Sequence, residues 1–205
     1  MSGPPPLLTH KDHAEESVFK PEHLIREARR QKALAEANVP SICILDPDGD
    51  IVRWLLSTGH AQLDPNWACY HTSLYRFALG ETRLGVIGNA VGASFAVLLA
   101  EELFVCGCEL LVSITSAGQI LPLADPPYFV LIEKALRDEG TSYHYLPSAM
   151  YSQILPELLP LLDQVTARKS RRLHRGATWT TDAPFRETAS AIERYRELSI
   201  LGVEM

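Results

Sequence analysis

Apolar residues in this chain gather in short runs, and three of these runs have the length and composition of buried strands. They are SICIL (residues 41–45), LGVIG (84–88) and ELLVSI (109–114). The first run is followed directly by the proline and glycine turn DPDGD. Proline and glycine favour tight turns, so this sequence is typical of a strand that enters a loop.

The second and third runs flank GNAVGASFAVLLAEEL (88–103), where a glycine-punctuated turn leads into about ten residues with hardly a polar side chain. The pattern predicts a helix to about Cys106, and thus a strand, helix and strand within the 31 residues from Leu84 to Ile114. That length suits a right-handed parallel crossover. A helix that is apolar nearly all round must be covered on most sides, which predicts a layered α/β domain with this helix inside.

The other segments give weaker signals. We expect a surface helix at 21–37, with Leu24, Ala28 and Leu34 among charges and a stop at Pro40. Helices are also expected at 155–167 and after a strand in HRGATWTTDAPFRET, the latter capped near Asp182 or Pro184. The second of these helices places on one face Ala189, Ile192 and Tyr195.

Two further segments concern strands. LGVEM (201–205) indicates a last strand. The segment 128–147 is ambiguous between a short helix ending at Gly140 and a strand that returns as a hairpin through SYHY. No internal repeat is present in the sequence.

Composition supports one packed domain. The 205 residues are 46% hydrophobic and 21% charged, which is typical of a folded chain and not of a disordered one. We expect residues 1–20, rich in proline, histidine and charge, to form a loose arm, and residues 21–205 to form a single domain. The start has no signal-peptide pattern and the chain has no run of eighteen apolar residues, so we expect a cytoplasmic protein without a membrane partner.

Charge limits the partners. The net charge of −6 opposes binding to nucleic acid, although a small anion could still bind at a local site. The basic run RKSRRLHR (168–175) is either a solvated loop or a contact for an anionic partner. The four cysteines lack CxxC spacing and are expected to be free and mostly buried, and the sequence has no metal-ligand spacing.

Two turns are candidates for ligand binding because ligands of parallel sheets collect at the carboxyl ends of strands. In the turn 88–94, Gly92 allows close approach of a ligand and Ser94 could cap the helix, whose free N–H groups suit an anion. In SITSAGQI, Ser116 and Gly118 would face the same space. The glycine pattern fits a plain tight turn as well as a ligand cradle, and the absence of GxGxxG disfavours a nicotinamide enzyme.

A third candidate is the loop TWTTDAPFRE (178–187). Its aromatic, acidic and basic side chains could stack on a heterocycle and bind its edges. The alternative is structural, with Trp179 in the core and Asp182 as a helix cap.

The segment GNAVGASFAVLLAEELFVCGCELLVSITSAGQI (88–120) resembles the central segment of the nucleoside phosphorylase and nucleosidase superfamily. TWTTDAPFRET, followed by ERYRELSILGVEM, resembles the nucleoside-binding loop of that family and the strand that ends in Glu-Met-Glu. The resemblance extends from about Ser41 to Met205. It implies a three-layer α/β/α fold with a mixed central sheet, strands in the region of Tyr128, and cleavage of the N-glycosidic bond of a nucleoside.

The resemblance also implies roles for particular residues. Gly92 and Ser116 would lie near ribose and phosphate, and Glu204 and Met205 would begin the ribose-binding Glu-Met-Glu. A second group, near the base, would comprise Trp179 and Arg186. No cofactor is implied beyond phosphate as a co-substrate, and family members assemble from dimers, so we expect a homo-oligomer.

Two departures from the family pattern matter. The positions where uridine-type phosphorylases carry phosphate-binding arginines hold DPDGD (46–50), Ser113 and roughly Tyr70 and His71, although Arg53 or Arg76 could substitute. A carboxylate-rich first loop would repel phosphate, which favours water as the nucleophile.

The second departure is that the sequence stops at Met205, just before the glutamate that the resemblance assigns to the ribose hydroxyls. The following helix, the strand with the usual acid for the base and the terminal helix are also missing. We expect either a fragment or a degenerate family member, with an incomplete fold that is inactive by itself. Three hypotheses follow: a phosphorylase, a hydrolytic nucleosidase, or a non-catalytic nucleoside-binding remnant of the fold.

Overall fold

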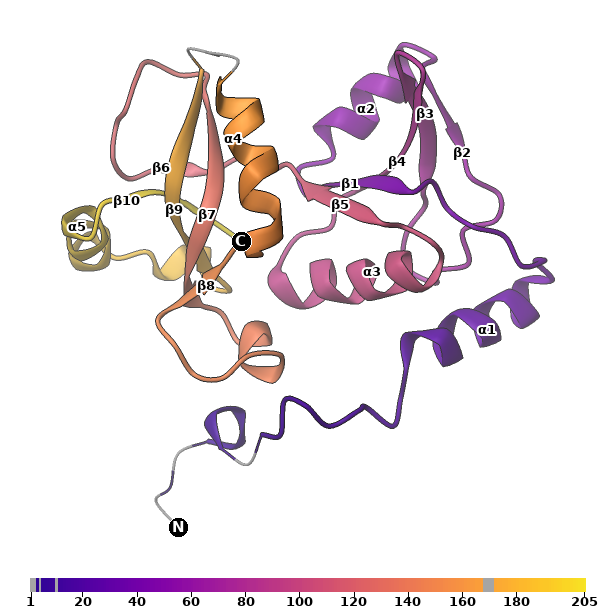
Figure 1. Cartoon of the computed structure of the whole chain (residues 1–205), viewed down its shortest axis with the longest axis horizontal. Helices are drawn as coiled ribbons and strands as arrows, with labels where there is room; N and C mark the ends of the chain where they lie inside the picture. The colour runs from indigo at the N-terminus through magenta and orange to yellow at the C-terminus, as the bar shows by residue number, and fades with distance from the viewer. Residues whose placement is uncertain (1–2, 4, 10, 168–171) are drawn as a thin grey trace. The chain divides into compact units, whose positions relative to one another are not determined.

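The computed structural model describes residues 3, 5–9, 11–167 and 172–205, and the chain divides into two compact units (Figure 1). The first, here called the β1 unit, comprises Ala14–Ser116. The second, here called the β9 unit, comprises Ala117–Met205 and the described residues before Ala14. Each unit contains one five-stranded mixed sheet, which confirms the expected α/β fold class and divides the strands between two sheets.

The β1 unit has the strand order β2-β3-β4-β1-β5, in which β1 is parallel to both β4 and β5. The three strands expected from the apolar runs are therefore adjacent, and the strand–helix–strand crossover passes over β1. The elements of this unit are α1 (Pro21–Lys32), β1 (Ile42–Asp46), α2 (Asp50–Ser57), β2 (Ala61–Leu63), β3 (Tyr75–Leu79), β4 (Thr82–Gly88), α3 (Ala93–Val105) and β5 (Leu110–Ser113).

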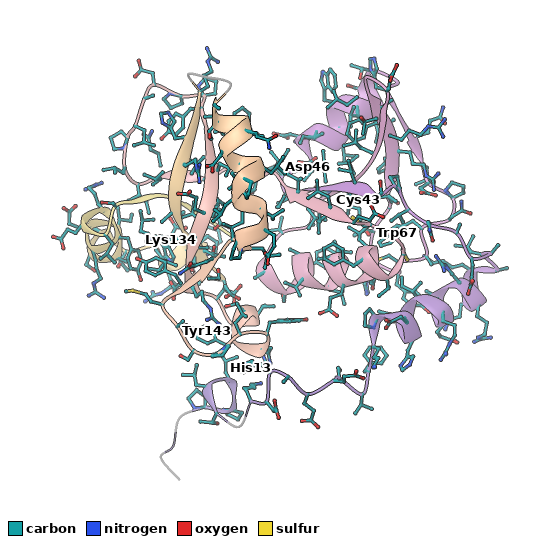
Figure 2. All side chains as sticks on the ribbon, in the orientation of Figure 1. His13, Cys43, Asp46, Trp67, Lys134 and Tyr143 are labelled. Carbon is teal, nitrogen blue, oxygen red and sulfur yellow. The ribbon has the colours of Figure 1, made fainter. Side chains whose placement is uncertain are left out.

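Helices cover both faces of this sheet, so the β1 unit has three layers (Figure 1). Alternate residues of β1 point to opposite faces, as the period of two in a strand requires. Cys43 packs in the cluster that includes α1 and α3, whereas Ile44 packs against the cluster of α2. Figure 2 labels Cys43 within this unit.

Two expectations for the helices of this unit are wrong. The first helix ends at Lys32, where Ala33 adopts a left-handed C-cap with φ of 54°, and not at Pro40. Helix α3 buries only one face: Phe104 on its outer face is 50% exposed, so the helix is not covered on most sides within this chain. The buried face also carries Glu102, whose pKa is raised by burial, with the Cys69 thiol acting in the opposite direction.

The β9 unit has the strand order β6-β10-β9-β7-β8, in which β9 is parallel to both β10 and β7. Its 3₁₀ helices are η1 (Pro6–Leu8), η2 (Thr141–His144), η3 (Pro156–Leu158) and η4 (Pro184–Arg186), and its α-helices are α4 (Leu159–Ala167) and α5 (Ala189–Glu197). Its strands are β6 (Gly118–Gln119), β7 (Phe129–Asp138), β8 (Tyr151–Gln153), β9 (Leu173–Thr181) and β10 (Ile200–Glu204).

Strand β7 resolves the ambiguity of 128–147 in favour of the strands that the family resemblance implied. The returning strand of the hairpin is β8, which pairs antiparallel with β7. It is not SYHY, since that segment lies largely in η2. The helix after β9 begins later than expected: its N-cap is Thr188, whose hydroxyl accepts from the N–H of Ala191. Ala191, with Ile192 and Tyr195, packs on the sheet in place of Ala189.

The described arm residues before Ala14 belong to the β9 unit, and two of them contact η2 of that unit. Lys11 Nζ lies 2.9 Å from His144 Nδ1, and the His13 ring lies 3.3 Å from the carbonyl oxygen of Tyr143. Figure 2 labels His13 and Tyr143. Within the described residues, no helix is long and apolar enough to span a membrane. The assignment of residues 21–205 to a single domain stays a prediction.

Asp46, at the end of β1, is buried and organises the loop that follows (Figure 2). Its carboxylate accepts from the N–H of Gly49 at 3.1 Å and from the N–H of Val52 at 2.9 Å, so it caps the first turn of α2. Because Gly49 has a φ of 73°, the turn also requires a residue that tolerates the left-handed region.

We predict that Asp46→Asn lowers the free energy of unfolding by about 1–3 kcal/mol, because one buried N–H loses its acceptor. Chemical denaturation measures the loss. The control is Glu81→Gln in the exposed β3–β4 turn, which removes the same charge and should change stability by less than about 0.5 kcal/mol. Equal effects of the two variants would contradict the capping role.

All four cysteines are free and buried, as expected from the sequence. Burial raises the pKa of each thiol, and that of Cys43 reaches about 12, with the neighbouring Cys108 contributing. Because the thiolate is the reactive form, we predict that the folded protein reacts slowly with a chromogenic disulfide reagent at pH 8, and rapidly after denaturation. A thiol that reacts within seconds in the folded protein would contradict this prediction.

Candidate functional site

The carboxyl ends of β4, β1 and β5 meet at one edge of the sheet in the β1 unit, since the three strands are parallel. The loops that leave this edge contact one another: the N–H of Asn89, after β4, donates to the carbonyl oxygen of Asp46 at 2.8 Å. A Cβ on Gly49 would lie 2.5 Å from the side-chain oxygen of Asn89. The loops after β1 and β4 are therefore closely packed at the edge of the sheet where ligands of parallel strands bind.

Ser116, which follows β5, is bound by the first loop. The carboxylate of Asp48 accepts from the N–H of Ser116 at 2.6 Å and from its hydroxyl at 3.0 Å. This pair of donors is the kind that binds an anion. In this structure the anion is a carboxylate supplied by DPDGD, so the loop interacts directly with the residue that the resemblance assigned to ribose and phosphate.

Gly92 is the N-cap of α3 and has a φ of 90°, a conformation that favours glycine. Apart from its two neighbours in the chain, no described residue has an atom within 4 Å of the position where its Cβ would be, so the backbone here faces open space. The helix has no side-chain cap, and thus the expectation that Ser94 caps it is wrong. The unpaired N–H groups of its first turn remain available to an oxygen or an anion.

The two arginines considered as substitutes for phosphate-binding residues differ in position. Arg53 lies on α2 beside the first loop, where it donates to the carbonyl oxygen of Asp48 at 3.2 Å and forms an ion pair with Asp50. Arg76 lies on β3 and pairs with the buried Asp64 at 2.5 Å. Of these two, only Arg53 is near the candidate site.

In the β9 unit, β10, β9 and β7 are parallel, and their carboxyl ends form a second edge. Glu204, at the end of β10, accepts hydrogen bonds from the hydroxyls of Thr178, at 3.1 Å, and Thr180. Burial raises the pKa of Glu204, while the two hydroxyls lower it and the charge of Glu139 raises it further. Met205 follows Glu204 and is half-buried.

Trp179 is a core residue. Its ring is 2% exposed, stacks edge-on against Tyr195, and donates from its indole nitrogen to Asp138 at 2.9 Å. A buried ring offers no free face to a heterocycle, so the geometry favours the structural alternative considered for this residue.

The loop after β9 exposes other side chains. Phe185 is fully exposed. Arg186 beside it is also exposed, and its side chain makes no hydrogen bond or ion pair to the described residues. Asp182 accepts from the N–H of Gly140 at 2.8 Å and so joins two loops, whereas the prediction that it caps a helix is wrong. A planar cation and an aromatic face are thus available where the resemblance placed the base.

The basic run at 168–175 is only partly described, since residues 168–171 lie outside the described residues. Arg175 binds Glu133 and Asp163, so its charge is neutralised within the unit. A cavity of about 400 Å³ lies beside Glu133 and is lined by residues that also include Lys134 and Leu159. None of the predicted site residues lines it. The described residues contain no group of three or more histidine, cysteine or acidic side chains suited to a metal ion.

Several residues of these edges have no clear signal in the sequence. The pattern predicts Asp48 only as a charge that repels phosphate, and it predicts no role for Asp46. The threonines that bind Glu204 lie in TWTT, where their i, i+2 spacing on a strand places both on one face. That spacing is the signal in the sequence that indicates two hydroxyl groups acting together on one face of the strand.

The solved structures that resemble this chain include two crystal structures of uridine phosphorylase from Vibrio fischeri ES114. One, determined with 6-hydroxy-1-naphthoic acid, is 21% identical with a TM-score of 0.67, and the match covers 82% of this chain and 69% of the other. The second is 20% identical with a TM-score of 0.68, and the match covers 85% and 73%. These likenesses show the fold.

A curated relative, an uncharacterised protein of Acanthamoeba polyphaga mimivirus, is 33% identical over 127 residues, which are 61% of this chain and 49% of that protein. The chain thus spans about half the length of this relative. The family model described as the phosphorylase superfamily matches residues 41–205. Since this match includes both sheet edges described above, we conclude that the chain belongs to the phosphorylase superfamily.

Proposed function

We propose that this protein cleaves the N-glycosidic bond of a nucleoside. Membership of the phosphorylase superfamily supports the reaction class, and the solved relatives carry the name uridine phosphorylase. The observation that carries the proposal is the polar side chains at the carboxyl ends of the parallel strands, where α/β folds bind ligands. Phosphate is the expected co-substrate of a phosphorylase, and no cofactor is required.

The transition state of such a cleavage resembles an oxocarbenium ion, so positive charge develops on the sugar and negative charge on the departing base. In the β1 unit we assign Ser116 and Gly92 to the ribose and the nucleophile. In the β9 unit we assign Glu204 and Met205 to the ribose and the exposed guanidinium of Arg186 to the base. For Trp179 the assignment is indirect, since its buried ring supports the loop.

Hydrolysis is the second candidate, and the contact between Asp48 and Ser116 favours it. A carboxylate already occupies both donors of Ser116, and a phosphate brought to the same donors would meet its negative charge. Water has no such conflict. Its oxygen would attack the anomeric carbon, and the carboxylate of Asp48 would accept its proton. The electrons of the N-glycosidic bond would leave with the base, which would take a proton from a second water molecule.

We predict release of free base from at least one nucleoside in a panel of purine and pyrimidine ribosides and deoxyribosides, followed by chromatography with and without phosphate. Release by the 205-residue chain would also reject the expectation that it is inactive by itself. Release without phosphate identifies a nucleosidase. Release that needs phosphate and yields a sugar 1-phosphate identifies a phosphorylase. If a folded protein binds nucleosides in calorimetry but releases no base, the enzyme proposal is rejected and a non-catalytic binding role remains.

We further predict that Asp48→Asn strengthens phosphate binding about tenfold, because one negative charge beside Ser116 is removed. Base release without phosphate should decrease in the same variant. The matched control is Glu81→Gln, which makes the same change in net charge away from the loop. Phosphate affinity is measured by calorimetry, and an unchanged affinity in Asp48→Asn rejects the role given to this carboxylate.

A homo-oligomer is proposed with this function, as the family resemblance implied. The outer face of α3, where Leu98 and Phe104 are exposed, is compatible with association. Light scattering of the purified protein measures the oligomeric state.

A further inference from the structure

The geometry points to Thr178 and Thr180 as positioning residues that hold the Glu204 carboxylate ready for a ligand hydroxyl. The identity of the ligand, a nucleoside with a ribose, rests on the proposed function. The positioning of Glu204 by the two threonines rests only on the hydrogen bonds between β9 and β10.

The register of the two strands brings the three side chains to one face. In the parallel pairing, Glu204 is opposite Thr180 and Gly202 is opposite Thr178. Side chains two residues apart on a strand point to the same face, so both threonines lie on the side of Glu204. The Glu204 carboxylate reaches back along the strand to Thr178, whose hydroxyl lies 3.1 Å from it.

Both hydroxyls donate to the same oxygen, Oε1 of Glu204. Two donors fix the orientation of the carboxyl plane, and they leave Oε2 as the oxygen that can accept from a ligand. Thr178 is only 1% exposed, and its hydroxyl would be unpaired without Glu204. The pair of threonines therefore restricts the carboxylate before any ligand arrives.

The environment makes these hydroxyls important for the charge of Glu204. Burial raises the pKa of this carboxyl, and the nearby Glu139 raises it further, whereas the two threonines lower it. Hydrogen bonds from hydroxyl groups favour the ionised form. Without them, Glu204 would more often be protonated and would be a poorer acceptor for a sugar hydroxyl.

The neighbouring residues on β9 provide a control. Thr181 is also buried, but its hydroxyl accepts from the N–H of Ala183 at 3.2 Å and has no recorded contact with Glu204. A Thr181→Val variant thus removes a buried hydroxyl of the same strand from the opposite face. If the valine variants acted only by lowering stability, Thr181→Val should have the same effect as Thr178→Val and Thr180→Val.

The experiment compares Thr178→Val, Thr180→Val, their serine counterparts and Thr181→Val in the full chain. Titration of the Glu204 carboxyl is followed by NMR with ¹³C-labelled glutamate, and a Glu204→Gln sample identifies the signal. We expect both valine variants near Glu204 to raise its pKa, the serine variants to restore it, and Thr181→Val to leave it unchanged. In nucleoside cleavage, each of the two valine variants should raise KM about three- to tenfold.

An unchanged pKa of Glu204 in both valine variants overturns the inference, as does a raised pKa without any change in the KM for nucleosides. Failure of the proposed function gives a different result. In that case the pKa responds as expected, but the unsubstituted protein neither binds nor cleaves any nucleoside.

Discussion

The buried carboxylate of Asp46 is the contact on which the arrangement of the β1 unit depends. It binds two N–H groups at the start of α2, while the backbone oxygen of the same residue accepts from Asn89. One residue at the end of β1 thus fixes both the loop that follows it and its contact with the loop after β4. The position of Asp48, and with it the contact to Ser116, follows from this fixed turn.

The β9 unit uses the same principle with different residues. Its parallel strands also end together, and the polar groups there are paired before any ligand binds: Glu204 with two threonines, Trp179 with Asp138, and Asp182 with Gly140. Buried polar groups need such partners, because an unpaired one is costly. The pairing therefore stabilises the fold and orients the carboxylate at the same time.

The family likeness and the local chemistry carry different information. At 20–21% identity the solved uridine phosphorylases establish the fold, whereas the nucleophile of the proposed reaction would depend on a few side chains. The first loop of this chain contributes a carboxylate to Ser116. A phosphate ion and a carboxylate compete for the same N–H and hydroxyl donors, so a single acidic residue can alter the reaction without altering the fold.

The local pattern of the sequence determined the strands of the β1 unit, the burial of the cysteines and the last strand, because alternation and apolar runs report directly on burial. It also indicated the family, and with it the strands around Phe129 that periodicity left ambiguous.

The tertiary structure alone decided the contacts between distant residues. Trp179 packs in the core because Tyr195 of α5 covers its ring. Phe104 on the outer face of α3 stays exposed because no described element of this chain covers it. Asp48 and Ser116 are 68 residues apart, so no local pattern could pair them. The spacing of residues in the sequence limits which near neighbours can share a face of a helix or strand. Contacts between distant residues form only when the strands are placed side by side in the sheet.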